Sequence, residues 1–115
     1  MAQVDLNQVS NYSDYLHIVT STGVDTNDTA SVTPTISFPS MSSCAVFVDN
    51  ESGGATTHVV TVQTSHDGTV WVNESNAVTG AGTAKNTGLI ASKIRAKVTT
   101  GEGGASISTI TLIIK

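Results

Sequence analysis

The chain is a series of short runs in which apolar and polar residues alternate, separated by residues that favour turns. An alternation with a period of two predicts β-strands that bury one face. A continuous apolar run at residues 44–48 predicts a central strand covered on both faces. The pattern therefore predicts strands at residues 15–20, 31–38, 44–48, 58–65, 69–72, 93–99 and 106–114.

Turn-forming residues indicate how these strands are joined. The pair Asp67-Gly68 stands between two alternating runs, which is among the strongest short-range hairpin signals. The strands at 58–65 and 69–72 are therefore predicted to be antiparallel neighbours. The glycine-rich segment Gly101–Gly104 predicts a second hairpin between the last two strands.

Other segments predict loops or a sheet edge. Pro34 cannot donate a ladder hydrogen bond, so the strand at 31–38 is expected at an edge or with a bulge. Polar and small residues predict loops at 21–30, 49–55 and 73–88, the last with at most a short irregular strand.

Length and composition fit a single all-β domain. A chain of 115 residues is the size of one domain. It contains 18 Thr and 14 Val but only four Leu, and β-branched residues favour strands. The polar residues 1–14 are predicted to form an N-terminal arm. Residues 15–115 are predicted to form a single-domain antiparallel β-sandwich, jelly-roll or Ig-like, of about seven or eight strands.

Charge is unevenly distributed along the chain. The net charge of −4 gives no reason to expect nucleic acid binding. All five basic residues lie after residue 84, and eight of the nine acidic residues lie before it. This asymmetry is suited either to neutralisation within one fold or to contact between one copy and another.

Three of the basic residues share one strand face. Lys93, Arg95 and Lys97 alternate with apolar residues, so their side chains point to the same side of the strand at 93–99. One interpretation is an ordinary solvated face. The other is an assembly surface that binds acidic groups, and it makes these three residues the candidate partner-binding site.

The residues that often carry catalysis do not form a recognisable site. His17 and His58 lie within strand patterns and are predicted to be surface or half-buried strand residues, and His66 lies in the predicted turn. No HxH, HExxH or CxxC spacing is present, so no zinc site is predicted. Cys44 lies in the most apolar run and is predicted to be a buried, inert thiol. We therefore expect no enzyme activity, no cofactor and no metal.

Two short acidic clusters offer oxygen ligands of the kind that calcium uses. They are expected to be solvated turns, and they comprise Asp25, Asn27 and Asp28, and Asp49, Asn50 and Glu51.

No targeting signal or membrane span is expected. The first ten residues lack a basic segment followed by an apolar one, and no run approaches the ~20 apolar residues of a membrane helix. Folding in a cytoplasm is therefore expected.

The segment from Ser65 to Trp71 reads S-x-D-G-x-x-W. Asp67 can bond the backbone that follows it, Gly68 can adopt a positive φ, and Trp71, the only Trp, is expected to pack across the hairpin onto the first strand. Ser65, Asp67, Gly68 and Trp71 are therefore interpreted as a structural hairpin motif. The sialidase Asp-box is a poorer match, because it has one further residue between the Asp and the Gly.

This motif resembles the hairpins of many β-sandwich modules, including sugar-binding jelly rolls and small structural proteins of tailed bacteriophages. The segment K-I-R-A-K-V-T at 93–99, followed by a glycine turn and a final alternating strand, is similar to the close of phage head-decoration sandwiches. The resemblance covers residues 58–115.

The resemblance implies a structural virion protein, a capsid decoration or cement protein assembled in the host cytoplasm, that binds the outer surface of a phage capsid and stabilises it. The implied partners are the major capsid protein or another virion protein and further copies of the chain, with a trimer at a symmetry axis as the expected assembly. Neither nucleic acid nor a membrane is expected as a partner. The alternatives are a carbohydrate-binding module of a phage tail or fibre, against which an aromatic content of 4% weighs, and a β-domain of some other larger assembly.

Overall fold

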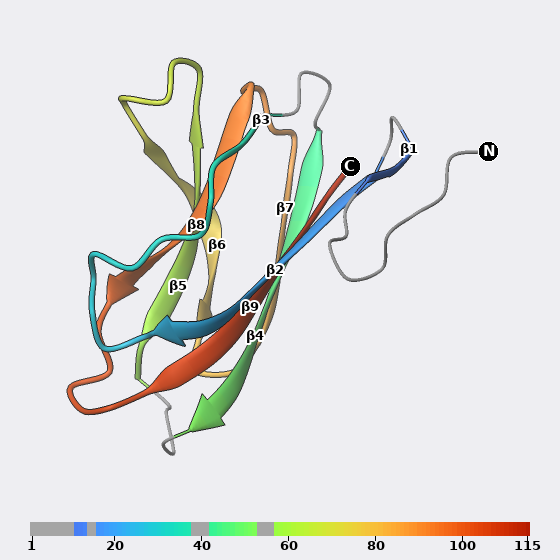
Figure 1. The fold of residues 1–115 in the computed structure, drawn as a ribbon. Coiled ribbons are helices and arrows are strands. Elements are labelled where there is room, and N and C mark those ends of the chain that lie inside the picture. Colours follow the sequence, from blue (N-terminus) through green and yellow to red (C-terminus); the bar gives the residue numbers. More distant parts are fainter. Residues whose placement is uncertain (1–10, 14–15, 38–41, 53–56) are drawn as a thin grey trace.

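The computed structural model describes residues 11–13, 16–37, 42–52 and 57–115. These residues form antiparallel strands and no helix, so the prediction of a single-domain β-sandwich is confirmed (Figure 1). The strands are β1 (Asn11–Ser13), β2 (Leu16–Asp25), β3 (Ile36–Ser37), β4 (Ser43–Ser52), β5 (Val59–Ser65), β6 (Val72–Thr79), β7 (Gly82–Thr87), β8 (Lys93–Thr100) and β9 (Ile107–Ile114).

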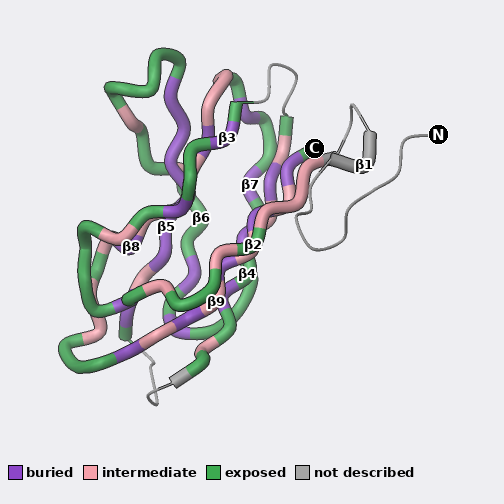
Figure 2. Tube along the Cα trace, in the orientation of Figure 1, coloured by how far each residue is buried: buried purple, intermediate pink, exposed green. Residues whose placement is uncertain are grey.

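Two sheets pack against each other. The first, sheet A, has the strand order β1-β2-β9-β4-β7, and the second, sheet B, has the order β3-β8-β5-β6. Every paired neighbour is antiparallel. Buried residues, purple in Figure 2, lie along strands of both sheets, and most of the buried residues of β4, β8 and β9 are apolar.

The core lies between the sheets and is built mainly from β4, β5, β8 and β9. In β8 and β9 every second residue is buried, as the alternation in the sequence predicts. Burying one Val, Ile or Leu side chain contributes about 1.5–3 kcal/mol relative to leaving it exposed. The fully buried apolar side chains include Val46, Val60, Val62, Ile94, Val98, Ile110, Leu112 and Ile114.

Two local signals in the sequence lead to the observed pairing. The strands on either side of Asp67-Gly68 are antiparallel neighbours, with Thr64 opposite Val72, so the predicted hairpin is confirmed. Its second strand begins at Val72 and not at Thr69 as predicted. The prediction for Pro34 also holds, because β3, which follows it, is an edge strand of sheet B.

Three predicted loops hold strand residues instead. Residues 49–55 were expected to be a loop, but β4 continues to Ser52, so the acidic cluster Asp49, Asn50 and Glu51 lies in a strand and not in a turn. The other two are edge segments. The segment 21–30 was expected to be a loop, but β2 continues through it to Asp25 and pairs with β9. The segment 73–88 was expected to be a loop and holds most of β6 and all of β7. These strands lie at or near sheet edges and expose most of their side chains, so they carry little of the apolar alternation by which strands are recognised.

The predicted second hairpin is wrong. β8 lies in sheet B, whereas β9 lies in sheet A between β2 and β4. The chain crosses from one sheet to the other through Gly101–Gly104, and the crossing is held to the end of β2 because Glu102 N donates to Thr26 O and Thr26 N donates to Ser106 O. Because the chain crosses between the sheets, the apolar face of β8 and the apolar face of β9 lie on opposite sides of the core.

Most of the predicted N-terminal arm, residues 1–10 and 14, lies outside the described residues. Of the arm, Asn11–Ser13 forms β1, which pairs with β2 at the edge of sheet A.

Candidate functional site at the hairpin between β5 and β6

The tip of this hairpin is fixed by a small set of hydrogen bonds. The Ser65 hydroxyl oxygen accepts from Gly68 N at 2.8 Å and donates to Asp67 Oδ1 at 3.1 Å. Asp67 Oδ1 also accepts from Thr69 N at 2.8 Å and Val70 N at 3.0 Å. Gly68 has a φ of 81°, which only glycine adopts without strain. The motif residues therefore act together to hold one turn conformation.

The same bonds affect the charge of the tip. The backbone N–H groups of Thr69 and Val70, followed by the Ser65 hydroxyl, hold the pKa of Asp67 below its ordinary value of 3.8. Each of these bonds favours the carboxylate over the neutral acid. The tip thus carries a negative charge throughout the neutral range.

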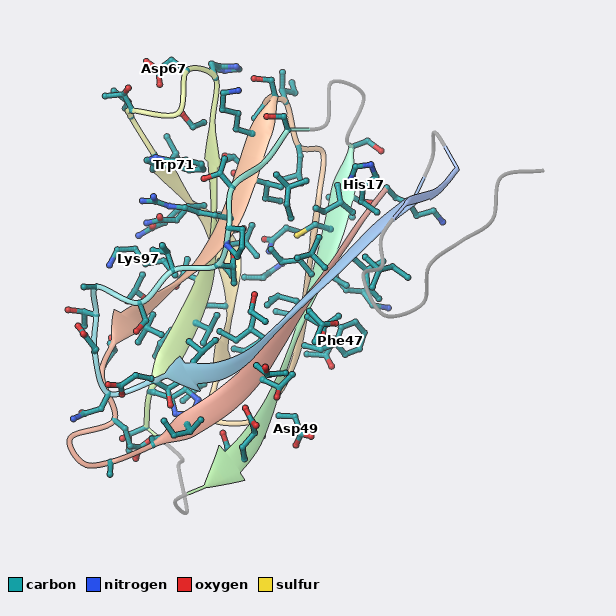
Figure 3. All side chains as sticks on the ribbon, in the orientation of Figure 1. His17, Phe47, Asp49, Asp67, Trp71 and Lys97 are labelled. Carbon is teal, nitrogen blue, oxygen red and sulfur yellow. The ribbon has the colours of Figure 1, made fainter. Side chains whose placement is uncertain are left out.

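Trp71 closes the hairpin on the outer side of sheet B. Its Nε1 donates to Gly68 O at 3.2 Å, and its ring centroid lies 4.1 Å from Arg95 Cζ. The sequence predicted that Trp71 packs on the first strand of the hairpin, β5. The ring instead contacts Arg95 of β8, which is the strand beyond β5 in sheet B. Figure 3 shows Trp71 on the side of the molecule that also bears Lys97.

Arg95 is held in place by a row of polar groups that crosses three strands. Arg95 Nε donates to Gln63 Oε1 at 2.8 Å, and Gln63 Nε2 donates to Asn73 Oδ1 at 2.8 Å. Gln63 is paired in register with both Arg95 and Asn73. The guanidinium is therefore fixed by both a hydrogen bond and a cation–π contact.

The other two basic residues of this face are also anchored. Lys93 Nζ donates to Ser37 Oγ at 3.2 Å, and Lys97 Nζ donates to the backbone oxygen of Thr29. Both lysines and Arg95 are half-buried and alternate with the buried inner face of β8, as predicted. Their partners are all neutral, and within the described part of the chain no carboxylate forms an ion pair with them. The result is a face with three positive charges that no carboxylate of the described residues pairs with; below it is called the basic face.

A hollow of about 320 Å³ lies beside the same hairpin tip and was not anticipated from the sequence. Val70, Val72 and Ile90 on its wall expose 67%, 59% and 85% of their surface, which makes them the most exposed large apolar residues of the described chain. Glu74 also lines it and accepts a hydrogen bond from Thr64 Oγ1 at 2.8 Å. An exposed apolar group rimmed by polar residues is typical of a surface that binds another protein.

Of the three histidines, His66 lines the hollow at the hairpin tip, whereas His17 and His58 lie elsewhere. His58 is fully buried, so the prediction of a surface or half-buried residue is wrong for it; His17 is half-buried in β2, as expected. His58 Nδ1 lies 2.9 Å from Glu102 Oε1, and this carboxylate lies in the crossing between β8 and β9. Hydrogen bonds from Thr57 and His58 lower the pKa of Glu102 from 4.5 to about 2, which suits a structural clamp.

Cys44 is buried, and two residues of the first acidic cluster, Asp25 and Asp28, bond to nearby backbone. Burial raises the pKa of the Cys44 thiol to about 12, with a smaller effect of Glu74, so the group stays protonated. Asp25 Oδ1 accepts from Asn27 N, and Asp28 Oδ1 accepts from Ala30 N, in turns that follow β2. Among the residues that the structure describes, no three His, Cys, Asp or Glu side chains gather where they could hold a metal ion, and no helix is long enough and apolar enough to cross a membrane.

Comparisons with known proteins show similarity of fold and not of sequence. No family model matches the chain, and no curated protein matches its sequence. The SPBc2 prophage-derived protein YomS superposes with a TM-score of 0.56 at 7% identity, over 87% of this chain and 95% of YomS. The Yersinia pseudotuberculosis-derived mitogen superposes with a TM-score of 0.53 at 10% identity, over 93% of this chain and 86% of the mitogen. At these identities the shared feature is the β-sandwich.

Proposed function

We propose that the protein is a structural virion protein that decorates the outer surface of a bacteriophage capsid and acts by binding rather than by catalysis. The observation that carries this proposal is the basic face. Three cations are held by neutral partners on the outer face of sheet B. The exposed apolar group lies at the same hairpin but on the other face of the sheet, since Val72 pairs with Thr64, and Thr64 pairs with the buried Ile94. The prophage origin of YomS, which has a similar sandwich, adds support from an independent direction.

The two parts of the hairpin site have complementary roles in this proposal. The exposed side chains of Val70, Val72 and Ile90 supply the apolar area that becomes buried at a protein interface. The basic face meets acidic groups of a capsid protein, which guides encounter and orientation more than it adds affinity. Because Arg95 and both lysines are already anchored, little side-chain entropy is lost when a partner binds.

A sugar-binding role is less well supported by the same surroundings. Carbohydrate sites expose aromatic faces, but the ring of Trp71 is half-buried and one of its faces is taken up by Arg95. Glycan binding is nevertheless a measurable alternative, and a glycan array probed with the intact protein distinguishes it from capsid binding.

The test is binding to undecorated capsids of the phage or prophage that encodes the chain. The triple variant Lys93→Ser, Arg95→Ser, Lys97→Ser is expected to bind more weakly and with a shallower dependence on salt than the parent. Because Arg95 also contacts Trp71 and Gln63, the double variant Lys93→Ser, Lys97→Ser keeps the contact between Arg95 and Trp71 and serves as the second measurement.

The matched control is Lys115→Ser, which removes one of the two basic residues outside the basic face. It is expected to bind as the parent does. If the triple and double variants bind capsids like the parent at every salt concentration, the basic face is not the docking surface. Strong glycan binding without capsid binding would favour the sugar-binding module.

A further inference from the structure

The outer face of sheet A is a second exposed surface, on the side of the molecule away from the basic face. Figure 3 shows Phe47 and Asp49 on this side, opposite Trp71 and Lys97. Phe47 of β4 points outward and exposes 39% of its surface. Its neighbours across the sheet are Thr111 of β9 and Thr83 of β7.

The row of side chains that contains Phe47 is uncharged, and the next row toward the start of β4 is mostly apolar. One row along the strands, Ala45 stands opposite Ile113 of β9, and Ile113 stands opposite Ile18 of β2; all three are half-buried. In the row of Phe47 itself, the Thr20 and Thr111 hydroxyls bond to each other at 3.2 Å. Apolar and threonine side chains thus form a patch across four strands, and Ala45 and Ile113 on it line a hollow of about 280 Å³. Such a face is suited to packing against another sheet.

Two opposite charges flank this patch at equal distances from its middle. Lys85 of β7 stands opposite Ala45, two residues before Phe47 along β4, and Asp49 lies two residues after Phe47. Each is therefore about 7 Å from the row of Phe47 along the strands. Neither side chain forms a hydrogen bond or ion pair within the described part of the chain.

This arrangement is self-complementary. If two copies pack face to face about a two-fold axis that runs across the strands through Thr111, Phe47 and Thr83, the row of Lys85 in one copy lies over the row of Asp49 in the other. The same contact then occurs twice, as a two-fold interface requires. The two Phe47 rings meet near the middle, where apolar contact counts most.

We propose that the outer face of sheet A binds a second copy of this chain and forms a two-fold dimer with paired Lys85 and Asp49 side chains. Four strands about 4.8 Å apart and about eight residues long give a face of about 500 Å² per copy, or about 1,000 Å² for both. This area lies at the lower limit for specific interfaces, so the dimer dissociates on dilution. Its two hairpin sites lie at opposite ends, where each remains accessible.

The experiment is sedimentation velocity of the purified full-length chain over a range of concentrations, without capsids, so that its outcome is independent of the proposed capsid role. The parent is expected to change from monomer to dimer as its concentration rises. The variants Lys85→Asp and Asp49→Lys each place like charges opposite each other, and each is expected to weaken the dimer by about tenfold or more.

Charge exchange provides the sharper measurement. An equal mixture of the Lys85→Asp and Asp49→Lys chains is expected to form a mixed dimer, because each contact then joins opposite charges. The double variant carrying both changes is expected to dimerise like the parent. Phe47→Ser is expected to abolish the dimer while the protein keeps its fold, since this side chain lies outside the core. Ser75→Asp, on β6 of sheet B, is the control and is expected to leave the dimer unchanged.

Several results would overturn the proposal. A parent that remains monomeric, or single variants that associate like the parent, would reject this interface. A trimer would reject the two-fold arrangement, because a ring of three joins two different surface patches and not the same patch on both copies. A chain that dimerises only after removal of residues 1–10 would show that the face is covered by its own N-terminal segment instead.

Discussion

The indole of Trp71 and the guanidinium of Arg95 are in contact, with Arg95 Cζ 4.1 Å from the ring centroid. Arg95 lies on β8, and Trp71 lies just before β6. In sheet B, β5 separates these two strands. The contact therefore joins the two features that the sequence singled out separately, the hairpin motif and the basic residues. It links the conformation of the hairpin tip to the position of the central cation.

This contact predicts a measurable coupling in stability. Trp71→Ala removes a half-buried ring and the cation–π contact, and it is expected to lower the free energy of unfolding by about 1–2 kcal/mol. In a double-mutant cycle with Arg95→Ala, measured by urea unfolding, the coupling between the two residues is expected to be about 0.5–1 kcal/mol. Strictly additive effects would show that the two side chains are neighbours without interacting.

The close approach of Gly101 to the backbone of Asn27 predicts that a larger residue would clash in the crossing between the sheets. A Cβ atom added to Gly101 would lie 2.5 Å from the backbone oxygen of Asn27, which is too close for real atoms. Gly101→Ala is therefore expected to lower the free energy of unfolding by about 1–3 kcal/mol. Gly104→Ala, three residues on, meets nothing within 4 Å and is the control, expected within about 0.5 kcal/mol of the parent. Equal stability of the two variants would contradict this packing.

Glu102 predicts a dependence of stability on pH. Its pKa is lowered in the folded protein from 4.5 to about 2, so its contribution is present above the ordinary value and is lost as the pH falls toward 2. Glu102→Gln is therefore expected to destabilise the protein at neutral pH and to lose this difference from the parent in acid. Thermal unfolding of both proteins across this range tests it. A difference that stays constant with pH would show that the carboxylate charge is not what stabilises the crossing.

Cys44 predicts low chemical reactivity. The thiol is buried in sheet A and its pKa is raised to about 12, so almost no thiolate exists at neutral pH. The folded protein is expected to resist an aromatic disulfide reagent, whereas the protein unfolded in guanidinium reacts at once. Rapid reaction under native conditions would indicate that β4 separates readily from its neighbours.

The parts of the fold that the sequence predicted are those in which one residue dictates local geometry. Asp67-Gly68 specifies a turn through its hydrogen bonds and positive φ, and the alternation of β8 specifies which side of the strand is buried. Pro34 excludes a central strand because it lacks an N–H group. These effects depend on neighbours in the sequence.

The features that were missed depend on distant partners. Asn76 and Asn86 hold β6 and β7 together, since Asn76 N donates to Asn86 Oδ1 at 3.0 Å and Asn86 Nδ2 donates to Asn76 O at 3.1 Å. In the sequence the same asparagines favour a loop. The assignment of β8 and β9 to different sheets likewise follows from packing across the core, and the turn between them carries no signal for it.

For the same reason, the sequence predicted the basic residues of the hairpin site but neither their hydrogen-bond partners nor the hollow. Alternation along 93–99 placed Lys93, Arg95 and Lys97 on one face, but their neutral partners come from loops and other strands that the sequence could not bring together. A signal for the hollow was present in the apolar Ile90, which follows Gly88-Leu89 and precedes Ala91 without any polar alternation. A large apolar residue in a segment predicted to lie outside the strands is worth testing as a binding residue.

The central claim, that the protein decorates a capsid, is tested most directly by quantitative mass spectrometry of purified phage particles from the source of the sequence. The account predicts that the chain is present in a copy number comparable with that of the major capsid protein, and that it remains with the heads when tails are removed. Absence of the chain from purified particles, or a few copies that stay with the tails, would contradict it.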